Sequence, residues 1–189
     1  MHSDEELVRE LRQGSESAME DLVKRHYQMV FAYIYRYSGD YHTSYDLTQE
    51  TFIKMVRNVD SLVQQESFKV WLLKIALNTC RDYFKSRSYK TGQVSGEWNE
   101  AIAEDKAHVV DLFERKTESA SVKAALMELP SYQRETIILR FYQDLKIKEI
   151  ASLTSVGEPT VKSRIKQALS KLKTIIEKED EDDQKRGIK

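Results

Sequence analysis

The chain has 189 residues, of which 40% are apolar and 32% are charged, and its formal net charge is −1. This composition is typical of folded helical proteins and excludes disorder throughout the chain. The single cysteine, Cys80, excludes a disulfide framework and a cysteine-based metal cluster, and it fits a reducing compartment. No apolar run approaches the ~20 residues of a membrane span, and the acidic N-terminus is unlike a signal peptide. We therefore expect a cytoplasmic protein with no membrane insertion of its own.

Helical periodicity is nearly continuous along the chain, which holds only two prolines and six glycines, so the predicted fold class is all-α. The periodicity breaks after Lys90, where the sequence TGQVSGEWNE has two glycines and no apolar stripe. We predict two small helical domains joined by a flexible acidic linker and followed by a charged, disordered tail. The predicted bounds are 1–90 for the first domain, 91–115 for the linker, 116–176 for the second domain and 177–189 for the tail.

Charge is distributed unevenly over these parts. The linker carries 2 Lys and Arg against 6 Asp and Glu, whereas the second domain carries 11 against 6. A basic segment that follows an acidic one suggests a polyanion as the partner of the basic segment.

Four helices are predicted in the first domain, over residues 3–14, 15–39, 43–62 and 67–90. Thr43 is the expected N-cap of the third helix. The outward side of that helix carries Asp46, Gln49, Glu50, Ile53 and Arg57. Acidic and amide groups around an apolar side chain are typical of a docking patch for a basic helix of a partner protein. The alternative is a solvated face with one tolerated isoleucine.

The fourth helix carries two different surfaces. Apolar residues at three- and four-residue steps predict that one side is buried in a bundle. The opposite side carries Lys74, Asn78, Arg81 and Lys85 at the same steps. Taken alone, this polar stripe is most simply a solvated surface, and Trp71 at its edge is assigned to packing.

Four further helices are predicted in the second domain. Its second helix is expected over residues 132–142, with Phe141 facing inward. A short helix, a turn containing Gly157 and a longer helix with a basic outer face then follow the helix-turn-helix plan. The outer face of the last helix carries Pro159, Lys162, Ser163, Lys166, Gln167, Ser170 and Lys173. Lysine suits phosphate or guanine and glutamine suits adenine, so DNA is favoured over the alternative, a helical hairpin that only packs.

Four stretches in order resemble one protein family, the bacterial extracytoplasmic-function sigma factors, which are two-domain initiation subunits of RNA polymerase. DLTQETFIK at 46–54 resembles the core-binding helix of that family, and SFKVWLLKIALNTCRDYFKSR at 67–87 resembles its −10 and promoter-melting segment. LPSYQRETIILRFYQDLKIKEIA at 129–151 and PTVKSRIKQALSKLK at 159–173 are similar to its −35 reader. The resemblance implies a region 2 bundle in the first domain and a region 4 helix-turn-helix in the second.

The resemblance also implies partners. Core RNA polymerase would be bound through the clamp helices of its largest subunit and through its flap, and the clamp-helix contact would use Asp46, Gln49, Glu50, Ile53 and Arg57. Promoter DNA would be the second partner, and an anti-sigma factor the third. The sequence shows no nucleophile paired with a general base and no set of metal ligands, so we expect no enzymatic activity and no cofactor.

Promoter contacts follow from the same resemblance. Asn78 matches the asparagine that holds a flipped −10 base, and the other expected −10 contacts are Leu62, Lys74, Arg81 and Lys85. Expected −35 contacts are Pro159, Thr160, Lys162, Ser163, Arg164, Lys166 and Gln167. Periodicity places Arg164 at the boundary of the packed face, which suggests a contact to the DNA backbone.

Two other functions remain open at this point. The chain could be a helix-turn-helix regulator that binds duplex DNA without touching the polymerase core. It could also be a purely interacting helical protein, such as an inactive sigma-like antagonist. The outward face at 46–57 distinguishes these alternatives from a sigma factor, because only a sigma factor requires this face to bind core polymerase.

Overall fold

The computed structural model describes residues 2–63, 67–91 and 120–186, and nearly all of the predicted linker lies outside these ranges. Every regular element of the described part is helical, which confirms the all-α prediction. The elements are α1 (Asp4–Arg12), α2 (Glu16–Ser38), α3 (Tyr41–Asn58), η1 (Val59–Ser61), α4 (Phe68–Thr91), α6 (Ala120–Glu128), α7 (Ser131–Ile137), η2 (Ile138–Tyr142), α8 (Ile147–Thr154) and α9 (Glu158–Arg186).

The N-terminal bundle consists of α1 to α4, and each of its first three helices begins at a polar cap. Ser3 and Glu6 form a reciprocal capping box at α1, and Ser15 accepts a hydrogen bond from the backbone N–H of Ala18 at α2. The prediction that Thr43 caps α3 is wrong. Asp40 accepts the N–H of Thr43 at 2.7 Å instead, because its carboxylate is a stronger acceptor near the positive end of the helix.

Helix α4 packs against both α2 and α3, and its apolar side forms the centre of this bundle. Leu72, Ala76 and Cys80 are fully buried at four-residue steps, as the periodicity predicts. Trp71 is also buried and contacts Phe68 with ring centroids 5.9 Å apart, so its assignment to packing is confirmed. This burial holds α4 in one rotational position in the bundle.

The C-terminal bundle consists of α6, α7, η2, α8 and α9. Its second helix changes geometry after Ile137, where η2 is a π-helical turn closed by the bond from Gln143 N–H to Ile138 O at 3.1 Å. The wider turn shifts the register of the side chains, and Phe141 is 52% exposed rather than inward as predicted. Ser155, with φ of 58°, ends α8, and α9 then begins with Pro159 in its first turn.

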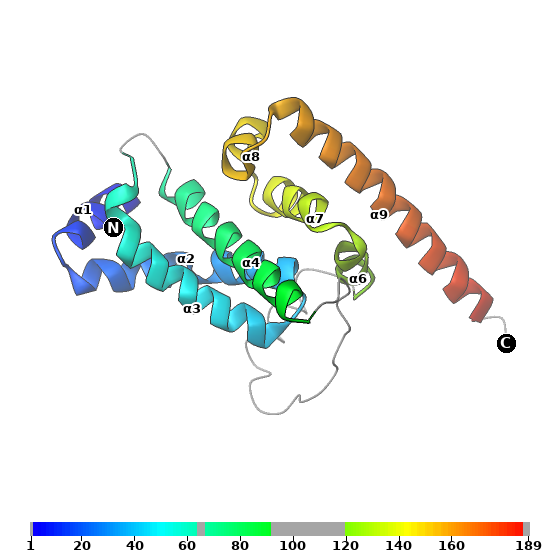
Figure 1. Ribbon diagram of the computed structural model, residues 1–189, viewed down its shortest axis with the longest axis horizontal. Coiled ribbons are helices and arrows are strands. Elements are labelled where there is room, and N and C mark those ends of the chain that lie inside the picture. The colour runs from blue at the N-terminus through cyan, green and yellow to red at the C-terminus, as the bar shows by residue number, and fades with distance from the viewer. Residues whose placement is uncertain (1, 64–66, 92–119, 187–189) are drawn as a thin grey trace.

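Helix α9 is longer than the sequence predicts. Its backbone is helical to Arg186, so the prediction of a disordered tail is wrong for residues 177–186. These residues include neither glycine nor proline, and Lys173 pairs with Glu177 one turn later at 3.6 Å. Such i,i+4 pairs and helix-favouring side chains extend a helix that is already nucleated by packing. In Figure 1 the C-terminal end of α9 projects away from the rest of the molecule.

The two bundles are packed against each other. Figure 1 shows α7 and α8 beside α4, and the buried apolar cluster continues from Leu73 and Leu77 of α4 to Ile138 and Leu139 of η2. At the end of α2, Gly39 lies against Met127 of α6. The C-terminal bundle therefore covers a side of α4 that the N-terminal bundle leaves open.

Gly39 and Gly14 form a matched pair for testing this packing, since both have left-handed backbones with φ of 75° and 87°. We expect Gly14→Ala to lower the free energy of unfolding by about 1–2 kcal/mol, the cost of a left-handed L-residue. Gly39→Ala should cost more, because its Cβ would also lie 2.9 Å from the Met127 side chain. Urea denaturation measures both values, and a smaller loss for Gly39→Ala would contradict the packing of α6 on α2.

Candidate nucleic-acid and protein interfaces

The outer face of α3 is exposed along its whole length. Asp46, Gln49, Glu50, Ile53 and Arg57 all lie at the surface, as predicted, and the Ile53 side chain is 50% exposed. Glu50 pairs with Lys54 at 2.8 Å in an exposed i,i+4 bridge, which contributes little to stability. Tyr45 and Val56, each 37% exposed, add to the apolar part of this surface.

The polar stripe of α4 is divided by the C-terminal bundle. Lys74, Asn78 and Lys85 are exposed, whereas Arg81 is turned toward α7. Arg81 belongs to a row at four-residue steps with Lys69, Leu73 and Leu77. Lys69 and Arg81 at the ends of this row both bond to the C-terminal bundle, so the buried leucines between them face that bundle as well. Helical spacing alone could not separate this row from the neighbouring stripe.

Arg81 is held by Glu135, a residue that the sequence reasoning missed. The Arg81 guanidinium donates from Nη2 to Oε1 at 2.6 Å and from Nε to Oε2 at 3.1 Å, a bidentate pair. Burial acts to lower the pKa of Arg81, but the hydrogen bonds and the charge of Glu135 outweigh it and raise that pKa. The signal in the sequence was an acid within the apolar second helix of the basic domain.

Leu62 does not form part of an exposed loop surface, so its assignment as a −10 contact is corrected. Its side chain is 8% exposed and packs in the core. The Arg12 guanidinium donates to the carbonyls of Leu62 at 2.6 Å and Val59 at 3.0 Å and thereby holds this segment in place. The neighbouring Val63 is the exposed side chain, because successive residues of an extended segment point to opposite sides.

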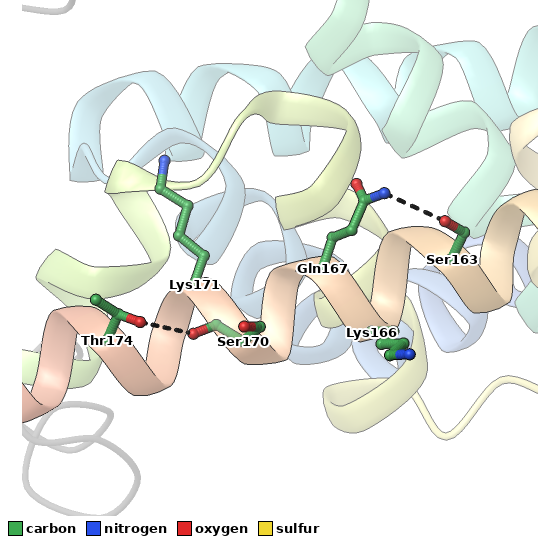
Figure 2. Close-up of a pocket in the computed structure, with 6 residues that line it drawn as sticks. All are labelled: Ser163, Lys166, Gln167, Ser170, Lys171 and Thr174. Atoms are coloured by element: carbon green, nitrogen blue, oxygen red, sulfur yellow. Dashed lines mark hydrogen bonds between the residues drawn. The ribbon is translucent and has the colours of Figure 1, made fainter.

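The outer face of α9 is exposed and polar, as predicted for Pro159, Thr160, Lys162, Ser163, Lys166 and Gln167. A shallow hollow along it is lined by Ser163, Lys166, Gln167, Ser170, Lys171 and Thr174. Figure 2 shows the Gln167 amide bonded to the Ser163 hydroxyl at 3.2 Å, with Lys166 pointing to a different side of the helix. The Gln133 amide also donates to Gln167 Oε1 at 3.3 Å, so the Gln167 side chain is held in a defined orientation.

Arg164 lies at the boundary of the packed face of α9, as the periodicity predicts. It stacks over the Tyr132 ring at 5.2 Å, and its Nη1 lies 3.8 Å from the same Oε1 of Glu135 that Arg81 contacts. The structure thus brings one predicted −10 residue and one predicted −35 residue together at a single carboxylate. Among the described residues, the structure shows no cluster of His, Cys, Asp and Glu arranged for a metal and no helix long and apolar enough to cross a membrane.

Comparison with known proteins agrees with both bundles. Residues 22–89 match the family model for sigma-70 region 2, and residues 119–172 match the model for sigma-70 region 4. The chain belongs to the sigma-70 family, in its extracytoplasmic-function group. The region 2 match includes α3 and nearly all of α4, and the region 4 match includes Glu135, the turn after α8 and the exposed residues of α9 from Pro159 to Gln167.

Individual sigma factors are similar to most of this chain. The chain is 29% identical over 172 residues to the ECF RNA polymerase sigma factor BldN of Streptomyces coelicolor, covering 90% of this chain and 65% of BldN. It is 30% identical over 168 residues to the ECF RNA polymerase sigma factor SigE of Mycolicibacterium smegmatis, covering 87% of this chain and 65% of SigE. The chain therefore spans less than two thirds of the length of these two relatives. Among solved structures, a similar fold is found in the sigma factor RpoE of Bartonella quintana, which was determined in complex with the anti-sigma factor NepR. The TM-score is 0.69 at 22% sequence identity, and the match covers 84% of this chain and 96% of RpoE.

The reactivity of the Cys80 thiol tests which side of α4 is buried in the core of region 2. Burial raises the pKa of its thiol well above the ordinary range, so the reactive thiolate is scarce in the folded chain. We expect Cys80 to react with a thiol reagent at pH 8 at least about 100-fold more slowly in the folded chain than in urea, because burial both shields the sulfur and reduces its thiolate fraction. Ser152→Cys in the exposed part of α8 is the control and should react at once. Equal rates for both thiols would mean that this side of α4 is not buried.

Proposed function

We propose that this chain is an alternative sigma factor that binds core RNA polymerase, directs it to promoters with −35 and −10 elements and helps to open the −10 DNA. The observation that carries the proposal is the presence of three chemically different exposed surfaces on the region 2 and region 4 folds. These surfaces are an acidic and apolar face on α3, an amide between two lysines on α4 and a basic outer face on α9. The factor itself performs no bond chemistry, needs no cofactor and works in the cytoplasm.

The polymerase would dock on the α3 face. Asp46, Gln49 and Glu50 offer acceptors and an amide around the half-exposed Ile53, a combination that suits a basic helix with an apolar side. The clamp helices of the largest subunit are the proposed partner of this face, and region 4 would contact the flap. A regulator that binds only duplex DNA would have no use for this face, so the face favours the sigma factor over that alternative.

The −35 element would be read by α9. A helix whose N-terminal turns enter the major groove presents its outer residues to base edges and phosphates. Lys162 and Lys166 supply cations, and the oriented Gln167 amide is suited to adenine. Pro159, Thr160, Ser163 and Arg164 would complete the contact, with Arg164 on the DNA backbone.

The −10 element would be opened along α4. Extruding a base costs a few kcal/mol, which pocket contacts and backbone cations must offset. Asn78 is the amide between the exposed Lys74 and Lys85, so it is the proposed base contact, and the lysines would bind phosphates of the melted strand. Arg81 belongs to the same proposal but is engaged by Glu135 in this structure.

An anti-sigma factor as a further partner stays a prediction. The similar fold of RpoE was determined in a complex with the anti-sigma factor NepR, which makes such a partner a reasonable expectation for this chain.

The docking face can be tested by the double substitution Gln49→Ala with Glu50→Ala. We expect it to abolish co-purification with core polymerase and run-off transcription, because the face loses its central polar groups, while duplex binding by region 4 is retained. The matched control is Glu20→Ala with Gln28→Ala on the exposed side of α2. Glu20 forms an i,i+4 bridge with Lys24 at 3.0 Å, the counterpart of the Glu50 bridge with Lys54 at 2.8 Å. Normal co-purification of the α3 variant with core polymerase would reject the docking proposal.

The role of Asn78 in melting can be tested by Asn78→Ala. We expect run-off transcription from a duplex promoter to fall about tenfold, as for the loss of one base contact of 1–3 kcal/mol. A template with a pre-melted −10 bubble should lose less, since the cost of unpairing is already met. Ser86→Ala, also exposed on α4, is the control and should behave as the unmodified chain on both templates. An equal loss on the two templates would assign Asn78 a structural role instead.

A further inference from the structure

The contact between regions 2 and 4 is crossed by several charged donors. Lys69 of α4 donates to Gln143 O at 2.7 Å, and Arg134 of α7 donates to Tyr37 O at 2.7 Å. Arg81 of α4 donates twice to Glu135 of α7. The groups are partly buried and come from both regions, and they accompany the apolar contact of Leu73 and Leu77 with Ile138 and Leu139, so the contact is specific and combines polar with apolar groups.

Glu135 occupies the centre of this contact. Its side chain is 2% exposed, and its Oε1 lies 2.6 Å from Arg81 Nη2 and 3.8 Å from Arg164 Nη1. A buried carboxylate with two guanidinium neighbours resembles a DNA phosphate in charge and in hydrogen-bonding geometry. Both arginines are proposed DNA contacts, so Glu135 holds groups that the promoter would otherwise bind.

This arrangement is incompatible with binding both promoter elements at once. The −35 and −10 elements lie about 25 base pairs apart, or ~85 Å along a duplex that rises 3.4 Å per base pair. The arginines that would contact them lie within 4 Å of the same carboxylate oxygen. Regions 2 and 4 must therefore separate before Arg81 and Arg164 can reach their elements.

We propose that this structure is a self-inhibited closed state of the factor, in which Glu135 acts as an internal phosphate mimic that latches region 4 onto region 2. The inference rests on the proposed function for its consequence at the promoter, whereas the closed state itself is a property of the chain alone. Opening releases Arg81 and Arg164 together, which couples the −10 surface to the −35 surface.

One buried polar group near the pair of Arg81 and Glu135 favours a reversible contact. Among the described residues, the Tyr33 hydroxyl is fully buried and has no hydrogen-bond partner, and it lies close enough to Glu135 and Arg81 to be influenced by their charges. Such a group costs about 1–3 kcal/mol where it is buried unpaired. Separation of the regions lets water reach the latch, which lowers the free-energy difference between the closed and open states.

The closed state is tested by measuring a distance across the contact in the full chain. Spin labels at Asp21→Cys on α2 and Lys148→Cys on α8 use exposed positions outside the proposed binding surfaces, and the buried Cys80 stays unlabelled. We expect one short, narrow distance distribution for this labelled reference chain. Glu135→Gln, which keeps the side-chain shape and removes the charge, should add a long, broad component.

Two lysine variants separate opening from local effects. Lys69→Met removes an inter-region hydrogen bond without touching Glu135, so it should also populate the long distance. Lys24→Met makes the same change of charge at an exposed pair on α2 and should leave the distribution unchanged. Far-UV circular dichroism of each variant shows whether its helices are intact. If Glu135→Gln fails to fold, Lys69→Met alone decides the question.

Binding of a fluorescein-labelled duplex of mixed sequence tests the consequence. Glu135→Gln and Lys69→Met should bind about fivefold more tightly or better, the lower end of typical coupling between two states. Lys69→Met is the more decisive variant. Loss of its positive charge alone would weaken DNA binding, so tighter binding by this variant must come from the separation of the two regions.

The two assays distinguish failure of the latch from failure of the proposed function. A long, broad distribution already present in the labelled reference chain, or short distances in both Glu135→Gln and Lys69→Met, would overturn the closed state. Opening of these variants without a gain in DNA affinity would overturn the self-inhibition. An absence of run-off transcription in every variant, with the distances as expected, would reject only the sigma function.

Discussion

The burial of α4 on two sides is the constraint on which the rest of the structure depends. One side packs on α2 and α3, and the row from Lys69 to Arg81 meets the C-terminal bundle. Between Phe68 and Arg81 only Lys74 and Asn78 are exposed, and the exposed positions become frequent again from Asp82 to Arg87, where Lys85 lies. Because a helix in a close-packed core cannot rotate without losing its contacts, this packing alone determines which polar residues of α4 are accessible.

The three exposed surfaces differ in how they relate to the inter-region contact. The α3 face lies away from the residues that form this contact, so polymerase docking is possible while the molecule is closed. Arg81 and Arg164, in contrast, are held by the contact itself. This difference suggests an order of events in which the polymerase binds first and the two regions separate afterwards. The free energy of docking could then favour the open state without any change in the DNA-binding residues.

Much of the fold could be predicted because it depends on local chemistry. The capping box at Ser3, the apolar side of α4 and the helix-turn-helix plan with Pro159 all follow from residue type and spacing. The errors arose where local signals competed. Asp40 was a better cap than Thr43, a π-helical turn rotated Phe141 out of the core, and the Arg12 bonds hold the segment in which Leu62 is buried. In each case a contact or backbone geometry outside the periodic pattern decided the outcome.

The sequence by itself determined most of the helices, the apolar and polar sides of α4 and the exposed polar residues of α3 and α9, since helical periodicity repeats every 3.6 residues irrespective of neighbours. It could not decide which neighbour covers a given side. Lys74, Asn78, Arg81 and Lys85 share one stripe by spacing, yet only Arg81 meets Glu135, 54 residues along the chain. That pairing depends on how region 4 lies against region 2, and only the tertiary structure holds this information, because it arises from contacts between distant segments.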